Sequence, residues 1–369
     1  MPLKIANIVG ARPNFMKIAP IIDEMKEHAE IEATLVHTGQ HYDEKMSKLF
    51  FDDLGLPVPD VYLGIGSGGH GEQTGKVMIE FEKIVQTNKP DIVLVVGDVN
   101  STIACGLVAV KLGIKLAHVE AGLRSYDRGM PEEINRVLTD QISDYLFLTE
   151  RSAFLNLERE GIAAERIHFV GNVMIDSLMK HRARAEQATI LRDLKLESGK
   201  YGLITLHRPS NVDLKENLER IFYALYQLQR DLPLVFPVHP RTRKQIKQFG
   251  LEELVAHAPN LIWTDPLGYL DFLKLMAHAR LVITDSGGIQ EETTVLGVPC
   301  ITVRENTERP VTVTEGTNLV IGMSPQRIIE EGYRILEGNG KKGGVPEFWD
   351  GKAAERIVKI LLDERSILR

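Results

Sequence analysis

Short apolar runs alternate with longer amphipathic stretches along almost the whole chain. In the first half the apolar runs have the length of strands and carry almost no charge, which is typical of strands covered on both faces. We expect strands at 5–9, 31–37, 60–63, 92–98, 114–121, 144–148 and 167–171. Between them the apolar positions recur at helical spacing, and the expected helices are 13–28, 43–54, 72–88, 100–113, 132–142 and 150–160. This alternation predicts an α/β fold with a parallel, doubly wound sheet.

A second series of the same kind follows a charge-rich helical stretch at about 172–199, which contains no apolar strand. The runs GLITL, PLVFPV, NLIWT, LVIT, PCITV and NLVIG are the expected strands, and the helices between them are 214–230, 241–249, 269–278, 289–296 and 325–337. We therefore predict two Rossmann-like domains, 1–171 and 172–350, that face one another across a cleft. We expect the last helix, within about 351–369, to pack back on the first domain.

The motif TDSGGIQEE at 284–292 joins a strand to a helix in the second domain. We expect a tight turn over 285–288, in which Gly287 and Gly288 allow positive φ and close backbone approach, and a helix that begins at Ile289. The free N–H groups of a helix N-terminus, together with its partial positive charge, suit a phosphate. The alternative is that Ser286 only caps the helix.

Three acidic residues follow strands of the first domain. Asp98 ends one strand, Glu120 ends the next, and Glu132 opens the helix after the 124–131 loop. Because parallel strands end at one edge of a sheet, these carboxylates should lie close together, raise one another's pKa and serve as a general acid and base. The alternative is that Glu132 complements a helix dipole and that Asp98 is a turn residue.

Basic and aromatic residues gather in the second half. His207 and His239 each end a strand and are followed closely by arginine, which suits acid/base chemistry or phosphate binding. Arg304 and Arg309, with Arg12 from the first domain, offer guanidinium groups for a pyrophosphate. Further candidates are Phe272 and Tyr269, whose rings could stack on a base, and Glu292, whose carboxylate could reach a ligand hydroxyl.

Composition narrows the class of protein. The 369 residues are 43% hydrophobic and 26% charged, as in globular proteins, and the net charge of −7 argues against a nucleic-acid partner. No apolar run reaches the roughly 18–20 residues that span a bilayer, and the N-terminus lacks the pattern of a signal peptide. Cys105 and Cys300 lie far apart in apolar surroundings, so we expect reduced core thiols in a cytoplasmic protein.

Three other motifs carry less weight. Gly64-x-Gly66-x-x-Gly69 matches the dinucleotide fingerprint formally, but no acidic residue follows at the required distance, so we expect only a mobile glycine-rich loop. His118-x-Glu120 has no further ligand at metal-binding spacing, and we predict no metal site. The chain contains no Walker A pattern.

Taken together, these motifs resemble the non-hydrolysing UDP-N-acetylglucosamine 2-epimerases, which share the fold of GT-B glycosyltransferases. The motifs occur in the same order along nearly the whole chain: GARPNFMKIAP at 10–20, TGQHYD at 38–43, VVGDVNST at 95–102, HVEAGLR at 118–124, PEEINR at 131–136, LHRPSN at 206–211, PVHP at 237–240, TDSGGIQEE at 284–292 and ERP at 308–310. The resemblance implies interconversion of UDP-GlcNAc and UDP-ManNAc. UDP is eliminated to give 2-acetamidoglucal and is then added back, without NAD or any other cofactor.

The resemblance also implies roles for individual residues. Asp98, Glu120, Glu132 and His207 match the catalytic positions. The substrate-binding positions fall on Arg12, Lys17, Arg136, His239, Phe272, Ser286, Gly287, Gly288, Glu292 and Arg309. Among these, Ser286 and Gly287 match the pyrophosphate turn, Glu292 the ribose-binding acid and Phe272 the aromatic that stacks on uracil. A homodimer, an absence of membrane insertion and a role in polysaccharide biosynthesis are further expectations of the family.

Some positions depart from the family pattern. Asn14 stands where many members have glutamate, and His207 is followed by Arg-Pro. The loop GSGGHGEQTG replaces a segment that carries an Arg-Gln pair at a regulatory substrate site in several bacterial enzymes, although Gln40 and His41 of that site are present. The alternatives are an epimerase of a modified UDP-HexNAc such as a diacetamido uronate, a hydrolysing 2-epimerase, and a GT-B glycosyltransferase.

Overall fold

The computed structural model describes residues 1–39, 55, 58–253 and 257–365, and the chain divides into two compact units. Unit 1 comprises Met1–Lys180 and Glu347–Arg369, and unit 2 comprises His181–Pro346. The sequence placed the first boundary at 171/172, before helix α7 (Val173–Ala185). The division falls inside that helix because its first turns pack on unit 1, where the Ser177 hydroxyl donates to the carbonyl oxygen of Met16.

Unit 1 is built on a seven-stranded parallel sheet with the order β3-β2-β1-β4-β5-β6-β7. Its strands are β1 (Leu3–Val9), β2 (Ile31–His37), β3 (Val61–Tyr62), β4 (Ile92–Val96), β5 (Lys115–Ala121), β6 (Tyr145–Leu148) and β7 (Ile167–Phe169). The strand order reverses between β1 and β4, which makes their carboxyl ends a topological switch point. The predicted parallel, doubly wound sheet is confirmed.

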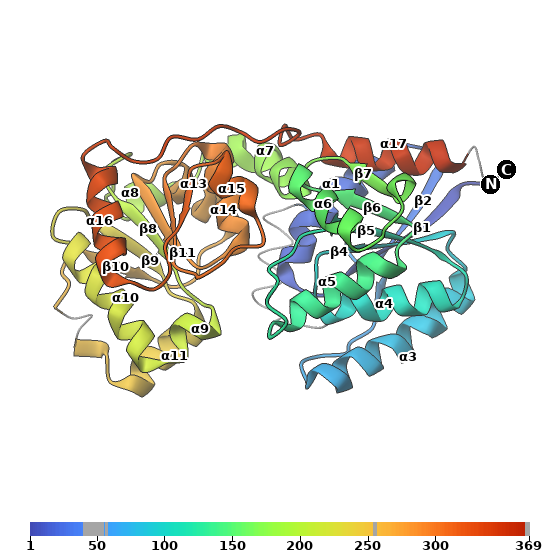
Figure 1. Ribbon diagram of the computed structural model, residues 1–369, viewed down its shortest axis with the longest axis horizontal. Helices are drawn as coiled ribbons and strands as arrows, with labels where there is room; N and C mark the ends of the chain where they lie inside the picture. The colour runs from blue at the N-terminus through green and yellow to red at the C-terminus, as the bar shows by residue number, and fades with distance from the viewer. Residues whose placement is uncertain (40–54, 56–57, 254–256, 366–369) are drawn as a thin grey trace. The chain divides into compact units, whose positions relative to one another are not determined.

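Helices cover both faces of this sheet, as Figure 1 shows. Helices α1 (Arg12–Lys26), α6 (Arg151–Arg159) and α17 (Ala353–Arg365) lie on one face, and α3 (His70–Asn88), α4 (Asn100–Lys111) and α5 (Pro131–Ile142) lie on the other. A short 3-10 turn, Ala164–Arg166, precedes β7. The last helix, α17, packs against α1 of unit 1, where the sequence placed it. The helix expected at 43–54 lies outside the described residues.

The apolar runs read from the sequence form the centre of unit 1. Val93, Leu94 and Val95 of β4 are completely buried, although their side chains alternate between the two faces of the sheet. Burial on both faces explains why this strand contains no polar position.

Unit 2 repeats the architecture with a six-stranded parallel sheet of order β10-β9-β8-β11-β12-β13. Its strands are β8 (Gly202–Thr205), β9 (Leu234–Pro237), β10 (Leu261–Thr264), β11 (Leu281–Thr284), β12 (Cys300–Thr302) and β13 (Asn318–Val320). Its helices are α8 (Ile190–Asp193), α9 (Pro209–Val212), α10 (Lys215–Leu228), α11 (Pro240–Phe249), α13 (Tyr269–Ala277), α14 (Gly287–Leu296), α15 (Pro310–Thr314) and α16 (Pro325–Leu336). The switch point lies between β8 and β11.

Two whole-chain features bear on the sequence analysis. Cys105 lies in unit 1 and Cys300 in unit 2, and both thiols are free and buried. Among the helices of the described residues, none is long and apolar enough to cross a membrane.

Candidate functional site

Asp98 follows β4 at the switch point of unit 1 and is held by Arg136 from α5. The Asp98 Oδ2 lies 2.5 Å from Arg136 Nη2, and Arg136 Nη1 pairs with the Glu133 carboxylate. Backbone N–H groups of Ser125 and Tyr126 donate to Glu133. Arg136, which the sequence placed among the substrate ligands, therefore orients a candidate acid.

Glu120 lies at the carboxyl end of β5 in a strained backbone conformation. Its φ is 71°, and the register of β5 against β6 shifts between Val119 and Ala121. Glu120 is only 4% exposed, and its carboxylate pairs with the ammonium group of Lys17 from α1. A non-glycine residue held at positive φ costs about 1–3 kcal/mol and is concentrated at functional sites. The strained backbone therefore supports a role of Glu120 in the site.

Gly97 connects these two acids. Its φ is 68°, and a Cβ atom at this position would lie 3.2 Å from Lys17 Nζ and 3.6 Å from Glu120 Oε2. Any larger residue would therefore be both strained and in contact with the ion pair. The β4 turn that carries Asp98 thus passes directly over the Lys17–Glu120 pair. The sequence predicted clustered carboxylates that raise one another's pKa, and the structure adds a cationic partner to two of them, Lys17 to Glu120 and Arg136 to Asp98.

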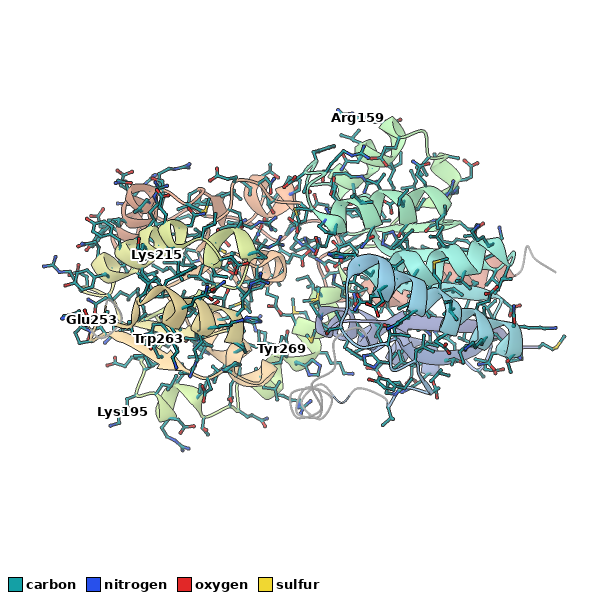
Figure 2. The ribbon with its side chains drawn as sticks, turned by 90° about the horizontal axis from the view of Figure 1, so that it is seen from below. Arg159, Lys195, Lys215, Glu253, Trp263 and Tyr269 are labelled. Carbon is teal, nitrogen blue, oxygen red and sulfur yellow. The ribbon has the colours of Figure 1, made fainter. Side chains whose placement is uncertain are left out.

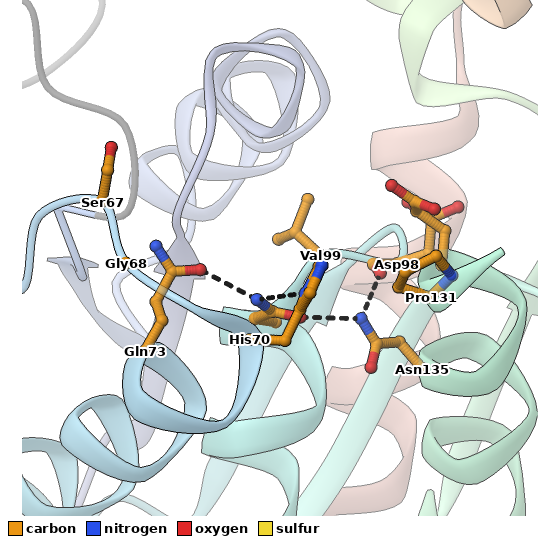
Figure 3. Close-up of a pocket in the computed structure, with 10 residues that line it drawn as sticks. Ser67, Gly68, His70, Gln73, Asp98, Val99, Pro131 and Asn135 are labelled. Carbon is orange, nitrogen blue, oxygen red and sulfur yellow. Dashed lines mark hydrogen bonds between the residues drawn. The ribbon is translucent and has the colours of Figure 1, made fainter. Parts of the chain in front are cut away.

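Glu132 lies in the first turn of α5, and its side chain is exposed. Glu132 and Asp98 line the same cavity, which has a volume of about 190 Å³ and is shown in Figure 3. Ser67 and Gly68, from the loop that the sequence read as merely glycine-rich and mobile, line it from the opposite side. The structure thus brings two of the three candidate acids to one cavity, and the third adjoins Asp98 through Gly97.

Asn14, one of the departures from the family pattern, supports this edge of the sheet. Its side-chain amide donates to the carbonyl oxygen of Val96, and its Oδ1 accepts from the backbone N–H of Ala11. Asn14 thus ties the start of α1 to the end of β4, where a glutamate could accept but not donate.

In unit 2, His207 is oriented by Asp285. Its Nδ1 lies 2.9 Å from Asp285 Oδ1, and the backbone N–H groups of His207 and Arg208 both donate to the same carboxylate. Asp285 is completely buried. Burial acts to raise the pKa of Asp285, but the hydrogen bonds and charge of His207 outweigh it and leave the pKa below its usual value. Asp285 was not among the site residues predicted from the sequence, although it stands inside the TDSGG motif.

The helix at the TDSGG motif differs from its prediction. Helix α14 begins at Gly287 rather than at Ile289, and neither Gly287 nor Gly288 has positive φ. Gly287 is needed for space, since a Cβ atom there would lie 3.0 Å from Arg309 Nη1. Ser286 occupies the N-cap position, but its side chain makes no capping hydrogen bond. The alternative that the Ser286 hydroxyl caps α14 is therefore not supported.

Three arginines surround Glu308 beside this helix. Arg304 Nη2 lies 2.7 Å from Glu308 Oε2, while Arg309 Nη1 and Arg208 Nη2 lie 3.2 Å and 3.4 Å from Oε1. Arg309 also pairs with Glu291 at 2.7 Å. Despite burial, these cations lower the pKa of Glu308 well below its usual range. The sequence found Arg304 and Arg309 but not the carboxylate that holds them in place.

Glu292 is buried one turn further into α14 and accepts a 2.8 Å hydrogen bond from the hydroxyl of Tyr269, which is labelled in Figure 2. Burial raises the pKa of Glu292 to about 7. Phe272 lies on the same helix as Tyr269, α13, and is half-buried. His239 is exposed and caps α11 by accepting from the backbone N–H of Arg241, and its ring lies 5.7 Å from that of His207.

The remaining candidates are only partly described. Arg12 is the first residue of α1, and its side chain lies outside the description, as do Gln40 and His41. His118, weighed above as a metal ligand, uses both ring nitrogens otherwise: Nδ1 lies 2.6 Å from Asp140 Oδ1, and Nε2 lies 2.8 Å from the carbonyl oxygen of Gly97.

Comparisons with known proteins agree with the motifs. A family model described as UDP-N-acetylglucosamine 2-epimerase matches residues 23–362. The UDP-N-acetylglucosamine 2-epimerase of Methanocaldococcus jannaschii is 46% identical over 97% of this chain and 99% of the relative. Its crystal structure in complex with UDP-GlcNAc and UDP superimposes with a TM-score of 0.89 over the same shares of the two chains. The UDP-2,3-diacetamido-2,3-dideoxy-D-glucuronate 2-epimerase of Pseudomonas aeruginosa is 42% identical over 97% of this chain and 99% of the relative.

Proposed function

The chain belongs to the UDP-N-acetylglucosamine 2-epimerase family, and from this premise we propose that it is an isomerase that interconverts UDP-GlcNAc and UDP-ManNAc. The observation that carries this proposal is the arrangement of acids in unit 1. Asp98 and Glu132 line one cavity, and the Lys17–Glu120 pair lies directly beneath the Gly97 turn. Two proton-transferring groups are the minimum for inversion at C2, because the proton leaves one face of the sugar and returns to the other.

The C2–H bond of the sugar is only weakly acidic, so loss of UDP from C1 runs ahead of proton removal. Positive charge then develops at C1 and in the ring, and nearby carboxylates stabilise it. One carboxylate takes the C2 proton to give 2-acetamidoglucal. After the opposite face of C2 is protonated, UDP adds back to C1. The reaction involves no net oxidation, so it needs no redox cofactor.

Unit 2 supplies the groups for the departing UDP. The N-terminus of α14 and the Arg208, Arg304 and Arg309 guanidinium groups provide N–H donors and positive charge for a diphosphate. We propose that Ser286, Gly287, Gly288 and Arg309 contact the diphosphate, that Glu292 binds the ribose hydroxyls and that Phe272 stacks on uracil. Further contacts are assigned to Arg12, Lys17 and His239.

His207 is assigned to the leaving oxygen of UDP. Because Asp285 holds Nδ1, the ring is fixed in orientation and Nε2 is left to donate to the ligand. A hydrogen bond to the departing phosphate oxygen stabilises the negative charge that forms as the C1–O bond breaks.

Proton NMR of UDP-GlcNAc incubated with the protein in D2O tests this function. We expect UDP-ManNAc to accumulate and deuterium to appear at C2 of both sugars. Release of free ManNAc with UDP would identify a hydrolysing enzyme instead. A C2 proton that never exchanges would exclude both reactions.

A second candidate substrate is a UDP-linked 2,3-diacetamido uronate, the substrate named for the relative that is 42% identical. The chemistry at C1 and C2 would be the same, while C3 and C6 would differ. The same NMR assay with this nucleotide sugar decides between the two through the ratio of kcat/KM values.

We also propose that the protein acts as a cytoplasmic homodimer and that its product is used for polysaccharide biosynthesis. The two free, buried cysteines are consistent with a reducing compartment. Light scattering of the purified protein would test the dimer, and fractionation of producing cells would test the location.

A further inference from the structure

The cavity beside Asp98 and Glu132 is small and is lined by both polar and apolar residues. Its volume of about 190 Å³ lies well below the roughly 300–1,000 Å³ of pockets that hold whole drug-sized ligands. Since a water molecule occupies roughly 30 Å³, the cavity has room for a few non-hydrogen atoms. It therefore matches a substituent of a ligand rather than a nucleotide or a sugar ring.

Side-chain amides form much of the polar wall, beside the Ser67 hydroxyl, the His70 ring and the Asp98 and Glu132 carboxylates. The amides are held in place by hydrogen bonds. Asn100 Nδ2 donates to Gln73 Oε1 at 2.8 Å, and Gln73 Nε2 donates to the carbonyl oxygen of Gly66 at 2.9 Å. Asn135 Nδ2 donates to the carbonyl oxygen of Asp98 at 2.9 Å. All three bonds join groups of different elements, and with a 3.3 Å bond from Asn135 Nδ2 to Asn100 Oδ1 they tie the glycine-rich loop, α3, α4 and α5 together. These contacts restrain the residues that form the wall of the cavity.

The apolar part of the wall comes from Val99 and Pro131. Figure 3 shows Val99 between Gln73 on one side and Asp98 with Pro131 on the other. A branched aliphatic side chain at this place limits how far an acyl group can extend. The combination of amide and aliphatic walls is chemically complementary to an acetamido group, which has a polar amide and a methyl end.

The position of the cavity identifies the substituent. In the proposed reaction, Asp98 or Glu132 must approach the hydrogen on C2, and the acetamido group is bonded to the same carbon. A group bonded to C2 therefore lies next to whichever carboxylate reaches that carbon. The nucleotide sugars named for the relatives, UDP-N-acetylglucosamine and the 2,3-diacetamido uronate, differ elsewhere but share the acetamido group at C2.

We propose that this cavity receives the 2-acetamido group of the nucleotide sugar and that Val99 sets the length of the acyl chain. This inference rests on the proposed function, since it takes C2 as the reacting carbon. Seating the acetamido group also fixes the rotation of the sugar ring relative to Asp98 and Glu132, because the exocyclic C2–N bond points into this cavity.

Substitution of Val99 by alanine tests the inference with UDP-GlcNAc and its N-propionyl analogue as probes. Calorimetry gives the affinities, and NMR in D2O gives kcat/KM. We expect the wild-type protein to prefer the acetyl compound by roughly 10–200-fold, the effect of one methylene group in a fitted pocket. Val99→Ala should reduce this preference by about 10-fold or more, through improved use of the propionyl compound. A gain of this kind does not arise from misfolding.

Val110→Ala is the matched control, since Val110 is an exposed residue near the end of α4, the helix whose N-cap is Val99, and this substitution should leave the preference unchanged. An unchanged acetyl preference in Val99→Ala would overturn the inference, and so would a loss of affinity for UDP alone. Failure of the proposed function can be told apart from failure of this inference. The former appears as an absence of hydrogen exchange at C2, whereas the preference for the acetyl compound is also measured by binding.

Discussion

His118 Nδ1 lies 2.6 Å from Asp140 Oδ1 in the interior of unit 1, and both side chains are completely buried. The other nitrogen of the ring, Nε2, donates to the carbonyl oxygen of Gly97, because a carbonyl can only accept. Burial acts to raise the pKa of Asp140, but His118 and Arg124 outweigh it and keep the carboxyl pKa below its usual value. The pair therefore fixes the peptide that precedes Asp98.

His118→Asn should lower kcat about 10²-fold, because a small displacement of a reacting group has an effect of this size. The affinity for UDP should change little, since the pair lies in unit 1 and the groups that we assign to the diphosphate, ribose and uracil lie in unit 2. Steady-state kinetics and calorimetry measure the two quantities. A wild-type kcat in a folded His118→Asn protein, with folding checked by circular dichroism, would contradict the positioning role.

The three acids are tested by charge-removing, isosteric substitutions. Asp98→Asn, Glu120→Gln and Glu132→Gln should each reduce turnover by roughly 10²-fold or more, because each removes a group from proton transfer or from charge stabilisation. UDP affinity should remain. Glu133→Gln is less suitable as a control because Glu133 holds Arg136, so exposed Glu355→Gln on α17 serves instead. Wild-type rates in all three variants would make the acid cluster structural.

Lys17→Met should lower the free energy of unfolding more than the substitution of an exposed residue does. The substitution leaves the buried Glu120 carboxylate without its ammonium partner, and breaking a buried pair in this way costs about 3–5 kcal/mol. We expect a lower denaturation midpoint together with a loss of turnover. The double variant Lys17→Met/Glu120→Gln should recover stability but not activity, and a double variant as unstable as Lys17→Met would rule out the buried charge as the cause.

The raised pKa of Glu292 predicts that the affinity for UDP depends on pH. Its pKa is raised to about 7, and only the ionised carboxylate can accept hydrogen bonds from both ribose hydroxyls with full strength. UDP affinity measured by calorimetry should therefore increase as the pH rises from about 6 to 8. Glu292→Gln should bind UDP about 10-fold more weakly and lose this part of the pH profile. Glu315→Gln, an exposed change in unit 2, should keep it.

The raised pKa of Asp176 predicts that the free energy of unfolding depends on pH. Its carboxylate accepts from the backbone N–H groups of Ala353 and Ala354 at the start of α17, and burial raises its pKa from 3.8 to about 6. Between these values the folded chain binds a proton that the unfolded chain has lost, so the free energy of unfolding falls as pH rises from about 4 to 6. The decrease amounts to at most about 3 kcal/mol.

Urea denaturation of the wild type and of Asp176→Asn across pH 4–6.5 measures this contribution. The variant should show a smaller decrease over the window, because asparagine keeps an acceptor for α17 but does not ionise. Parallel profiles for the two proteins would show that Asp176 does not titrate differently in the folded and unfolded chains.

The sequence determined the fold class, the family and the places of the candidate acids along the chain. The β-α alternation follows from apolar patterning, which reports burial directly, so strands such as β4 and the two sheets could be predicted. The placement of Asp98 and Glu120 at strand ends was predictable for the same reason, since consecutive parallel strands end at one edge. The motifs in their order gave the family.

Only the tertiary structure decided which side chains are paired. Lys17 and Glu120 are separated by 103 positions, and His207 and Asp285 by 78, so no local pattern could join them. The glycines of TDSGG were misread for a related reason. Their role depends on how close Arg309 approaches, and not on the φ angles that a local motif suggests. The pattern of apolar residues depends on the periodicity of each helix or strand and can be read locally. Side-chain pairs and cavities depend on packing between elements that are distant in the sequence.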